Sequence, residues 1–339
     1  MKLDKFDYKL PKDRIAQEPK KNRSDSKLMV LSKIDQTIQD DYFFNLCNHL
    51  SKNDLVIFNN TKVIPARLYG SKSTGGKVEI FFERKISDYD FLAFIKNFKL
   101  LDSKNEIIIS NTQKVIVEKK IGDFYHIRSD KTTVHELLDS YGNTPLPPYI
   151  NRKPTESDKN RYQTIYSSEI GSTAAPTAGL HFDEKVFSSM KSAGIQYCFC
   201  TLHIGLGTFS PIRTENINDY NIHSEFYSIP AETVEKISDC KKNHGRVIAV
   251  GTTVLRALES FYLNKNKTPD TFYDTNLFIK PGFSFSVVDG LITNFHLPKS
   301  SLLVLIAAFY GLEPTLRAYD HAINNQYMFF SYGDVNLII

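Results

Sequence analysis

The sequence predicts an α/β protein that is interrupted by a β-rich insertion, and three observations lead to this prediction. Residues 1–60 mix short strands with a helix. Between about residues 67 and 128 the chain becomes a series of short, turn-separated apolar segments. After residue 160, helical and strand patterns alternate, as is typical of an α/β domain. Because α/β-like stretches lie on both sides of it, we expect the β-rich block to be an insertion rather than a leading domain.

Two strands and one helix are predicted in the first block. The apolar runs at residues 26–32 and 54–60 indicate strands, and residues 42–50 have the apolar spacing of a helix. The second strand ends in Asn59 and Asn60, which Thr61 follows. Adjacent side-chain amides can bind the polar edge of a ligand, although an Asx-turn uses the same residues.

The β-rich block contains five predicted strands at nearly regular spacing, which favours a small sandwich or barrel. They cover residues 77–85, 88–96, 106–110, 114–120 and 123–129. A helix over 133–142 follows and ends at Gly142, and residues 144–150 form an extended connector.

The last block continues the alternation of helices and strands. Helices are predicted over 184–194, 232–245 and 252–262, and strands over 195–204 and 246–251. The longest apolar run, residues 302–310, is far shorter than the ~20 residues that span a bilayer. It predicts a short helix that is buried on all sides.

Composition and charge exclude little. The chain has 339 residues, which favours about two domains, and 41% hydrophobic with 24% charged residues is ordinary for a globular protein. The net charge of +4 is too small to indicate nucleic-acid binding by itself. Residues 1–27 are locally basic, since they contain nine Lys or Arg residues and five Asp or Glu residues.

The cysteines indicate neither disulfides nor zinc. Only Cys198 and Cys200 are close in sequence, and neither a C-x-x-C pair nor a zinc-type quartet is present with Cys47 and Cys240. We therefore expect reduced, buried thiols, no metal and a cytoplasmic protein. The charged start, "MKLDKFDYKLP", lacks the apolar region of a signal peptide.

Two segments rich in small residues are candidate ligand loops. Residues 171–182, "GSTAAPTAGLHF", contain Thr177 and His181, and small residues let the backbone approach a ligand closely. The alternative is a tight turn before a helix, with His181 packed inside. In "TLHIGLGTFSPI", His203 follows a strand and could be a base or a ligand donor, or simply a packed histidine. Ser210 and Pro211 exclude a dinucleotide-binding fingerprint there.

Three further polar clusters lie at strand ends and helix starts, where ligands bind in open α/β sheets. Gly251 precedes a helix that Thr252 or Thr253 could cap, and the free N–H groups there favour an anion. Arg256 would point near the same end. An extended segment at 161–166 and a helix entrance before 300 supply the remaining candidates, which are Arg161, Tyr162, Gln163, Thr164, Thr293, Asn294 and His296.

Together these segments resemble one family over nearly the whole chain, from "FDYKLPKDRIAQEP" to "FFSYGD". The motifs include NNTKVIPARL, GGKVEIFF, RYQTIY, GSTAAPTAGLHF, TLHIGLGTF, IHSE, GRVIAVGTTVLRALES and LITNFHLPKSSLL. They are similar to those of the S-adenosylmethionine:tRNA ribosyltransferase-isomerases of queuosine biosynthesis. The resemblance implies an α/β domain with an inserted antiparallel β-barrel. We expect residues 1–66 and 151–339 to form the discontinuous catalytic domain and residues 67–150 the barrel.

The resemblance also implies a reaction. The family transfers the ribosyl part of S-adenosylmethionine, as a substrate, to 7-aminomethyl-7-deazaguanine at the wobble position of tRNA, and adenine and methionine leave as epoxyqueuosine forms. Proton transfer suits histidine, whose ordinary pKa is ~6.5. The matched motifs supply His181, His203 and His223, with Glu225 two residues further on, as catalytic candidates. His296 also lies in a matched motif. Arg67 and Arg161 are candidates for RNA contacts, or else for structural ion pairs.

The chain departs from the family pattern at several positions. Met328 stands where the family usually has Arg, and Val335 and Asn336 where it has a hydrophobic pair. Lys27 and Lys62 replace arginines. We expect a monomer that binds tRNA and no membrane. The alternatives are a non-catalytic RNA-binding protein and an ordinary methyltransferase, and the missing Gly-rich fingerprint argues against the methyltransferase.

Overall fold

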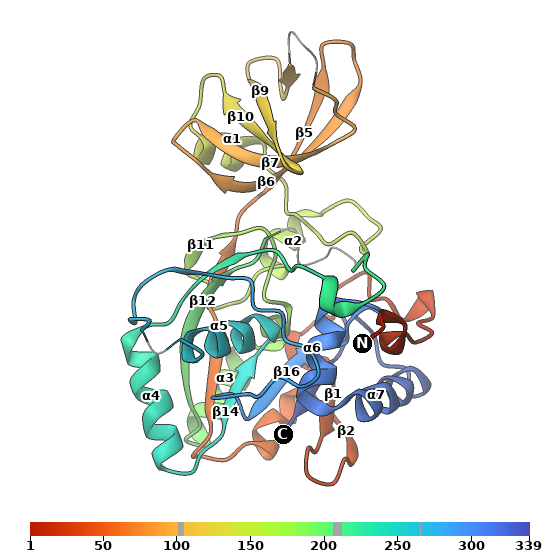
Figure 1. Ribbon diagram of the computed structural model, residues 1–339, viewed down its shortest axis with the longest axis vertical. Coiled ribbons are helices and arrows are strands. Elements are labelled where there is room, and N and C mark those ends of the chain that lie inside the picture. The colour runs from red at the N-terminus through yellow and green to blue at the C-terminus, as the bar shows by residue number, and fades with distance from the viewer. Residues whose placement is uncertain (101–104, 206–211, 265) are drawn as a thin grey trace.

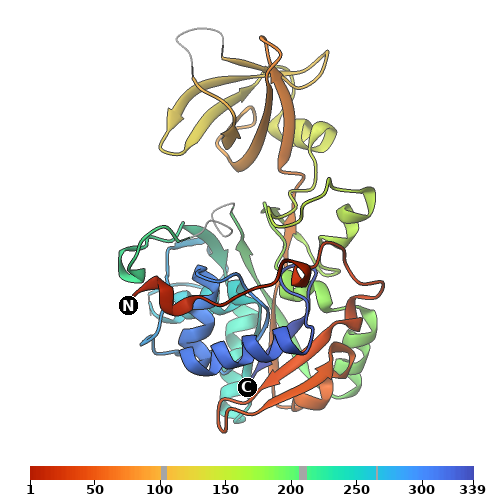
Figure 2. The ribbon, with the colours of Figure 1, turned by 90° about the vertical axis from the view of Figure 1, so that its right-hand side faces the viewer.

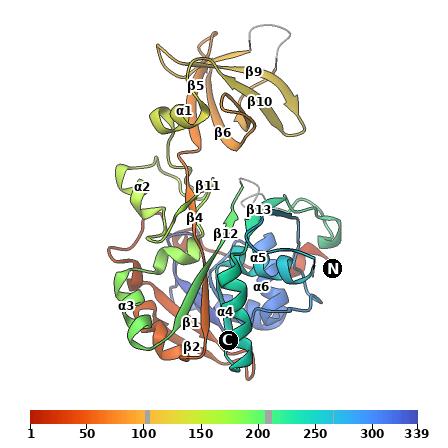
Figure 3. The ribbon, with the colours of Figure 1, turned by 90° about the vertical axis from the view of Figure 1, so that its left-hand side faces the viewer.

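A computed structural model describes residues 1–100, 105–205, 212–264 and 266–339. The molecule consists of an α/β body and a closed β-barrel that stands on one end of it (Figure 1). Views from two other sides show the same arrangement (Figures 2 and 3). The predicted fold class, a mixed α/β protein with an inserted antiparallel barrel, is therefore confirmed.

A nine-stranded mixed sheet forms the centre of the body. Its strands lie in the order β15-β13-β12-β3-β14-β16-β17-β1-β2. The bounds in that order are Tyr273–Thr275, Glu225–Ser228, Gln196–His203, Leu55–Asn59, Val247–Val250, Gly290–Asn294, Val335–Ile338, Lys27–Leu31 and Ile38–Tyr42. Strand β3 pairs in parallel with β12 and β14 on either side, so strands from before and after the barrel alternate in the middle of the sheet.

Burial on both faces explains why the central strands are apolar throughout. Leu55 and Ile57 of β3 point into one core, whereas Val56 and Phe58 point into the other, as the two-residue period of a strand requires. Helices α4 (Ala231–Lys242), α5 (Thr252–Tyr262), α6 (Ser301–Tyr310) and α7 (Leu312–Asn324) contribute to the first core. Helix α3 (Glu184–Ser192) and the 3₁₀ helices η4 (Phe43–His49) and η5 (Thr177–His181) contribute to the second.

The barrel has six antiparallel strands, one more than the sequence predicted. They lie in the order β10-β7-β6-β5-β8-β9. In chain order β5–β10 cover Arg67–Lys72, Lys77–Lys85, Asp90–Lys96, Glu106–Ile108, Lys114–Ile121 and Phe124–Ser129. Strand β5 escaped prediction because Leu68 is its one fully buried side chain, so it has no apolar alternation. Helix α1 (Val134–Tyr141) adds Val134, Leu137 and Leu138 to the barrel core.

One local prediction was wrong, and another holds with a different helix type. The helix predicted over 42–50 is present as the 3₁₀ helix η4, Phe43–His49. Residues 161–166 are not extended, because Arg161 ends helix α2 (Glu156–Arg161) and the rest of the segment joins no strand. A capping box between Thr155 and Asp158 starts this helix.

The junction between body and barrel is a pair of chain crossings. The outgoing chain leaves β4 (Thr61–Val63), which pairs with β11 (Glu169–Ser172). Gln163 holds this crossing, since its side-chain amide donates to the Val63 carbonyl (3.1 Å) and accepts from the Val63 N–H (3.0 Å). The chain that returns from the barrel to the body pairs with the chain that enters the barrel through an isolated antiparallel β-bridge between Asn143 and Arg67.

Candidate active site

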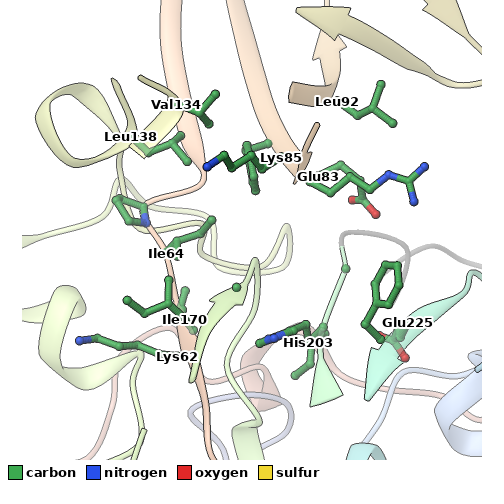
Figure 4. Close-up of a pocket in the computed structure, with 18 of the residues that line it drawn as sticks. Lys62, Ile64, Glu83, Lys85, Leu92, Val134, Leu138, Ile170, His203 and Glu225 are labelled. Carbon is green, nitrogen blue, oxygen red and sulfur yellow. The ribbon is translucent and has the colours of Figure 1, made fainter. Parts of the chain in front are cut away.

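A cavity of about 760 Å³ lies between the body and the barrel. We call it the interdomain cavity. Side chains reach it from both sides, with Glu83, Lys85 and Leu92 on the barrel facing Ile170 and His203 on the body (Figure 4). The remaining labelled wall residues are Lys62 and Ile64 from the connection, Val134 and Leu138 from α1, and Glu225 from β13.

His203, at the end of β12, is held in one orientation at this cavity. Its Nδ1 lies 2.8 Å from the Thr61 hydroxyl, and the Phe272 ring stacks on it at 5.7 Å. Gly171, at φ +152°, passes so close that a Cβ there would lie 2.9 to 3.1 Å from three ring atoms. Burial lowers the pKa of His203, and nearby Glu169 partly opposes this shift. The ring is therefore neutral near pH 7, and Nε2 has no hydrogen-bond partner among the described residues.

Glu225 and His223 line the same cavity in different environments. Glu225 is buried and forms a short ion pair with Arg256. This ion pair directs the Arg256 guanidinium toward β13 instead of the helix start where the sequence placed it, and the Arg256 Nε also donates to the Leu277 carbonyl at 3.1 Å. His223 is exposed. The site thus combines a buried carboxylate with two histidines of different solvent access.

The barrel contributes Glu83 through a break in strand register. The pairing of β6 with β7 shifts between Phe82 and Arg84, which leaves Glu83 as the extra residue of a bulge. A Cβ at Gly205 of the body would lie 3.2 Å from Glu83 Oε1. A barrel carboxylate therefore reaches the segment that follows His203.

A second cavity, of about 410 Å³, lies within the body at the carboxyl ends of β14 and β16. We call it the sheet-end cavity. The predicted residues that line it are Thr177, Gly251, Thr252, Thr253, Thr293, Asn294 and His296. Ile204, the residue after His203, lines both cavities, so they adjoin at the end of β12.

The start of α5 differs from the prediction that Thr252 or Thr253 caps it. Gly251 is the N-cap, with φ +94°, and no side chain caps the helix. Both threonines lie in the first turn, and Thr253 Oγ1 accepts a 3.4 Å hydrogen bond from Asn59. Gly251 is required because its left-handed conformation strains other residues.

The two fully buried histidines are neutral in the fold. Burial lowers the pKa of both His181 and His296 to about 3. His296 lies at the sheet-end cavity with Nε2 2.9 Å from the Thr293 hydroxyl. His181 lines neither cavity, and both its nitrogens are engaged, Nδ1 with Ser26 (2.8 Å) and Nε2 with Asn294 (2.9 Å).

The side-chain amides at the end of β3, Asn59 and the following Asn60, bind the neighbouring strand. Asn59 bonds both the N–H (3.0 Å) and the carbonyl (2.9 Å) of Leu202. Asn60 accepts from Thr201 at 2.7 Å and donates to Ser168. These two side chains join the end of β3 to β12 and to Ser168, the residue before β11, and so position Thr61 against His203.

The predicted RNA-contact arginines have partners within the protein. Arg67 donates to the Leu146 carbonyl at 3.0 Å and lies 3.4 Å from Glu79. Arg161 donates to the carbonyls of Lys20 (2.7 Å) and Lys21 (3.0 Å). Tyr162 and Thr164 are buried on either side of Gln163, whose side-chain amide bonds the Val63 backbone.

Several cavity residues were not among the sequence candidates. They are Ile64, Glu83, Arg84, Lys85 and Ile170, with Phe272 stacked on His203, whereas Gly171 begins the candidate loop 171–182. Lys62 stands out in the sequence only as a replacement for an arginine. The one signal in the sequence is the charged run at 83–85, which ends the apolar alternation of β6. Gly207, Ser210 and Pro211 of the Gly-x-Gly segment lie outside the described residues.

The four cysteines are free, and all except the half-buried Cys47 are buried. In the described ranges no cluster of three or more His, Cys, Asp or Glu residues could hold a metal ion. There, too, no single helix has the length and apolarity to cross a membrane, although α6 and α7, bent by 113°, satisfy that test as a pair.

Comparison with known proteins places these features in one family. The family model described as "Queuosine biosynthesis protein" matches residues 3–338. An S-adenosylmethionine:tRNA ribosyltransferase-isomerase of Nitrosomonas eutropha is 48% identical over 100% of this chain and 98% of that protein. One of Coxiella burnetii is 45% identical over 99% and 98%. The crystal structure of an S-adenosylmethionine tRNA ribosyltransferase from Thermotoga maritima is 31% identical, covers 99% of this chain and 100% of its own, and superimposes with a TM-score of 0.57.

Proposed function

This chain belongs to the queuosine biosynthesis protein family, and on that premise we propose the reaction that it carries out and the residues that perform it. It is an S-adenosylmethionine:tRNA ribosyltransferase-isomerase, the activity in the names of its relatives. The ribosyl group of S-adenosylmethionine is transferred to 7-aminomethyl-7-deazaguanine at the tRNA wobble position. Epoxyqueuosine forms, and adenine and methionine are released.

The observation that supports this assignment most is His203 at the interdomain cavity. The sulfonium of S-adenosylmethionine acidifies the neighbouring C5′ protons and is a leaving group, so the protein needs to position substrates and move protons. The aminomethyl ammonium has to lose a proton before its nitrogen attacks, and adenine has to gain one as it leaves. A neutral imidazole with Nε2 available serves as the base for the first step.

The cavity also suits a nucleotide that is splayed out of an RNA loop. Phe226 lines it and Phe272 stacks on His203, and aromatic faces of this kind stack on unpaired bases. Lys62, Arg84 and Lys85 supply positive charge for phosphates. We therefore assign the tRNA anticodon to this cavity, and propose a monomer that works on tRNA in the cytoplasm without a metal.

Replacing His203 by Gln tests the assignment. We expect turnover to fall by about two to four orders of magnitude, the usual worth of a general acid or base. The measurement is single-turnover release of adenine and methionine from S-adenosylmethionine with precursor tRNA. The melting temperature of the same variant is measured beside it.

The control is His321→Gln, because His321 is paired with Asp40 of β2, the strand at the opposite edge of the sheet from β12 and β13. This variant should keep a rate within a few-fold of wild type. A destabilised His203→Gln protein with a nearly normal rate would contradict the catalytic role. Release of S-adenosylhomocysteine by the wild type would instead indicate a methyltransferase, and no product at all a binding protein.

A further inference from the structure

We propose that the sheet-end cavity binds the amino-acid end of S-adenosylmethionine, with its carboxylate at the first turn of α5. This inference rests on the proposed function and divides the two substrates between the two cavities. The RNA nucleoside occupies the interdomain cavity, and the methionine part of the donor occupies the sheet-end cavity.

The first turn of α5 is a ready anion site. Gly251 leaves the helix without a side-chain cap. The N–H groups of residues 252–254 consequently have no acceptor among the described residues, and the helix dipole adds partial positive charge at this end. The helix has 11 residues, and its first two line the cavity.

An unpartnered hydroxyl at the same place gives an independent indication of a ligand. Thr252 is 6% exposed and lines the sheet-end cavity, yet its side chain makes no hydrogen bond within the described part of the chain. Buried polar groups are normally satisfied. Its neighbour Thr253 already accepts from Asn59, so Thr252 is the hydroxyl left for a ligand.

The charges around the cavity favour an anion over a cation. No Asp or Glu is among the described residues that line it, and Lys299 is the one charged side chain there. The ammonium of Lys299 lies 2.8 Å from Asp4 and 3.0 Å from Asp7, so its charge is already balanced by these two carboxylates and does not require the ligand as a partner. Ser300, which caps the start of α6, also lines the cavity, so a second helix N-terminus adds to the positive potential.

The size and position of the cavity select a small carboxylate over an RNA phosphate. A volume of about 410 Å³ is in the usual range for small-molecule pockets of ~300–1,000 Å³. The basic side chains suited to an RNA backbone line the other cavity. Because Ile204 lines both cavities, a donor anchored at α5 can extend its sulfonium and ribose toward His203.

Thr252→Val removes the hydroxyl and keeps the shape, and Thr252→Ser is its matched control. With saturating tRNA, we expect Thr252→Val to lower kcat/KM for S-adenosylmethionine by about 10- to 100-fold, which is the worth of a hydrogen bond to a charged group. The loss should lie mainly in KM. Thr252→Ser should stay within a few-fold of wild type, and KM for tRNA should be unchanged in both variants.

A second measurement tests the carboxylate directly on the wild type. Decarboxylated S-adenosylhomocysteine, which differs from S-adenosylhomocysteine only in the carboxylate, should inhibit at least tenfold more weakly, and Thr252→Val should narrow that difference. An unchanged kcat/KM for S-adenosylmethionine in Thr252→Val, or a raised KM for tRNA, overturns the site, and the latter identifies the anion as an RNA phosphate. A wild-type protein that never releases adenine overturns the proposed function instead.

Discussion

Asn336 is a buried polar residue whose burial costs stability. It is 1% exposed and lies in β17 between β16 and β1, and neither atom of its side-chain amide has a hydrogen-bond partner among the residues that the structure describes. An unsatisfied buried amide costs about 1–3 kcal/mol. We therefore expect Asn336→Val to raise the free energy of unfolding by about 1–2 kcal/mol in urea titrations followed by circular dichroism.

Asn59→Val is the matched comparison for Asn336→Val, because it removes a buried amide that is satisfied by two hydrogen bonds to the Leu202 backbone. This variant should lose stability. An Asn336→Val protein that is less stable than wild type would show that the amide has a partner after all, such as a buried water.

The two buried histidines make stability depend on pH. In the folded protein the pKa of His181 and of His296 is about 3, against an ordinary value of 6.5. Between these values the unfolded chain binds more protons than the folded protein, so acidification favours unfolding. Each histidine should remove up to roughly 1.4 kcal/mol of unfolding free energy per pH unit below 6.5, and nothing above it.

Denaturant titrations at pH 7.5, 6.0 and 5.0 measure this slope. His296→Gln removes one of the two titrating groups, so its stability should fall less steeply with acid than that of the wild type. Equal slopes in the two proteins would mean that His296 is already protonated, or solvated, in the fold.

At the scale of elements, the close approach of β11 to β12 holds the His203 ring. Gly171→Ala would place a Cβ within 3.1 Å of the imidazole and force it to move. We expect turnover to fall about tenfold or more, since small displacements of catalytic groups are costly. Gly75→Ala is the control, because Gly75 also has positive φ but no neighbour within 4 Å of an added Cβ. Comparable losses of rate in both variants would point to general backbone strain.

The elements also show which parts of the fold and of the candidate site could be predicted from the sequence. Buried strands such as β3 and amphipathic helices such as α3 were predicted because burial imposes an apolar period. The helix start at α5 was located, but its cap was not, since the choice between Gly251 and the threonines depends on backbone angles. Glu83 was missed because the bulge depends on the pairing register of β6 with β7, which the apolar pattern does not specify. Phe272 was missed because its stacking on His203 joins segments far apart in sequence.

At the scale of the whole molecule, we propose that residues 67–150 form a unit that folds alone. Val134, Leu137 and Leu138 complete the barrel core, which among the described residues includes Ala66 of the connection but no residue of a body strand. The isolated segment should show β-type circular dichroism and unfold cooperatively. Leu146 and Ile150 pack with Tyr162 and Leu180 of the body, so a shorter segment, 67–143, should be equally stable. Failure of both segments to fold would contradict the proposed domain bounds.

The placement of β3 between β12 and β14 has a consequence for synthesis on the ribosome. Residues 55–59 of β3 are synthesised early, yet both strands that pair with β3 lie beyond residue 195. The parallel partner of β1 is β17, at residues 335–338, which is synthesised last. The barrel, in contrast, finds all its strand partners within residues 67–129. The nascent chain therefore completes its insertion while β1 of the flanking domain has only β2 as a partner and the apolar strand β3 has none of its sheet neighbours. During that interval β3 is exposed to chaperones and to aggregation, and the rate of translation through the barrel sets how long the interval lasts.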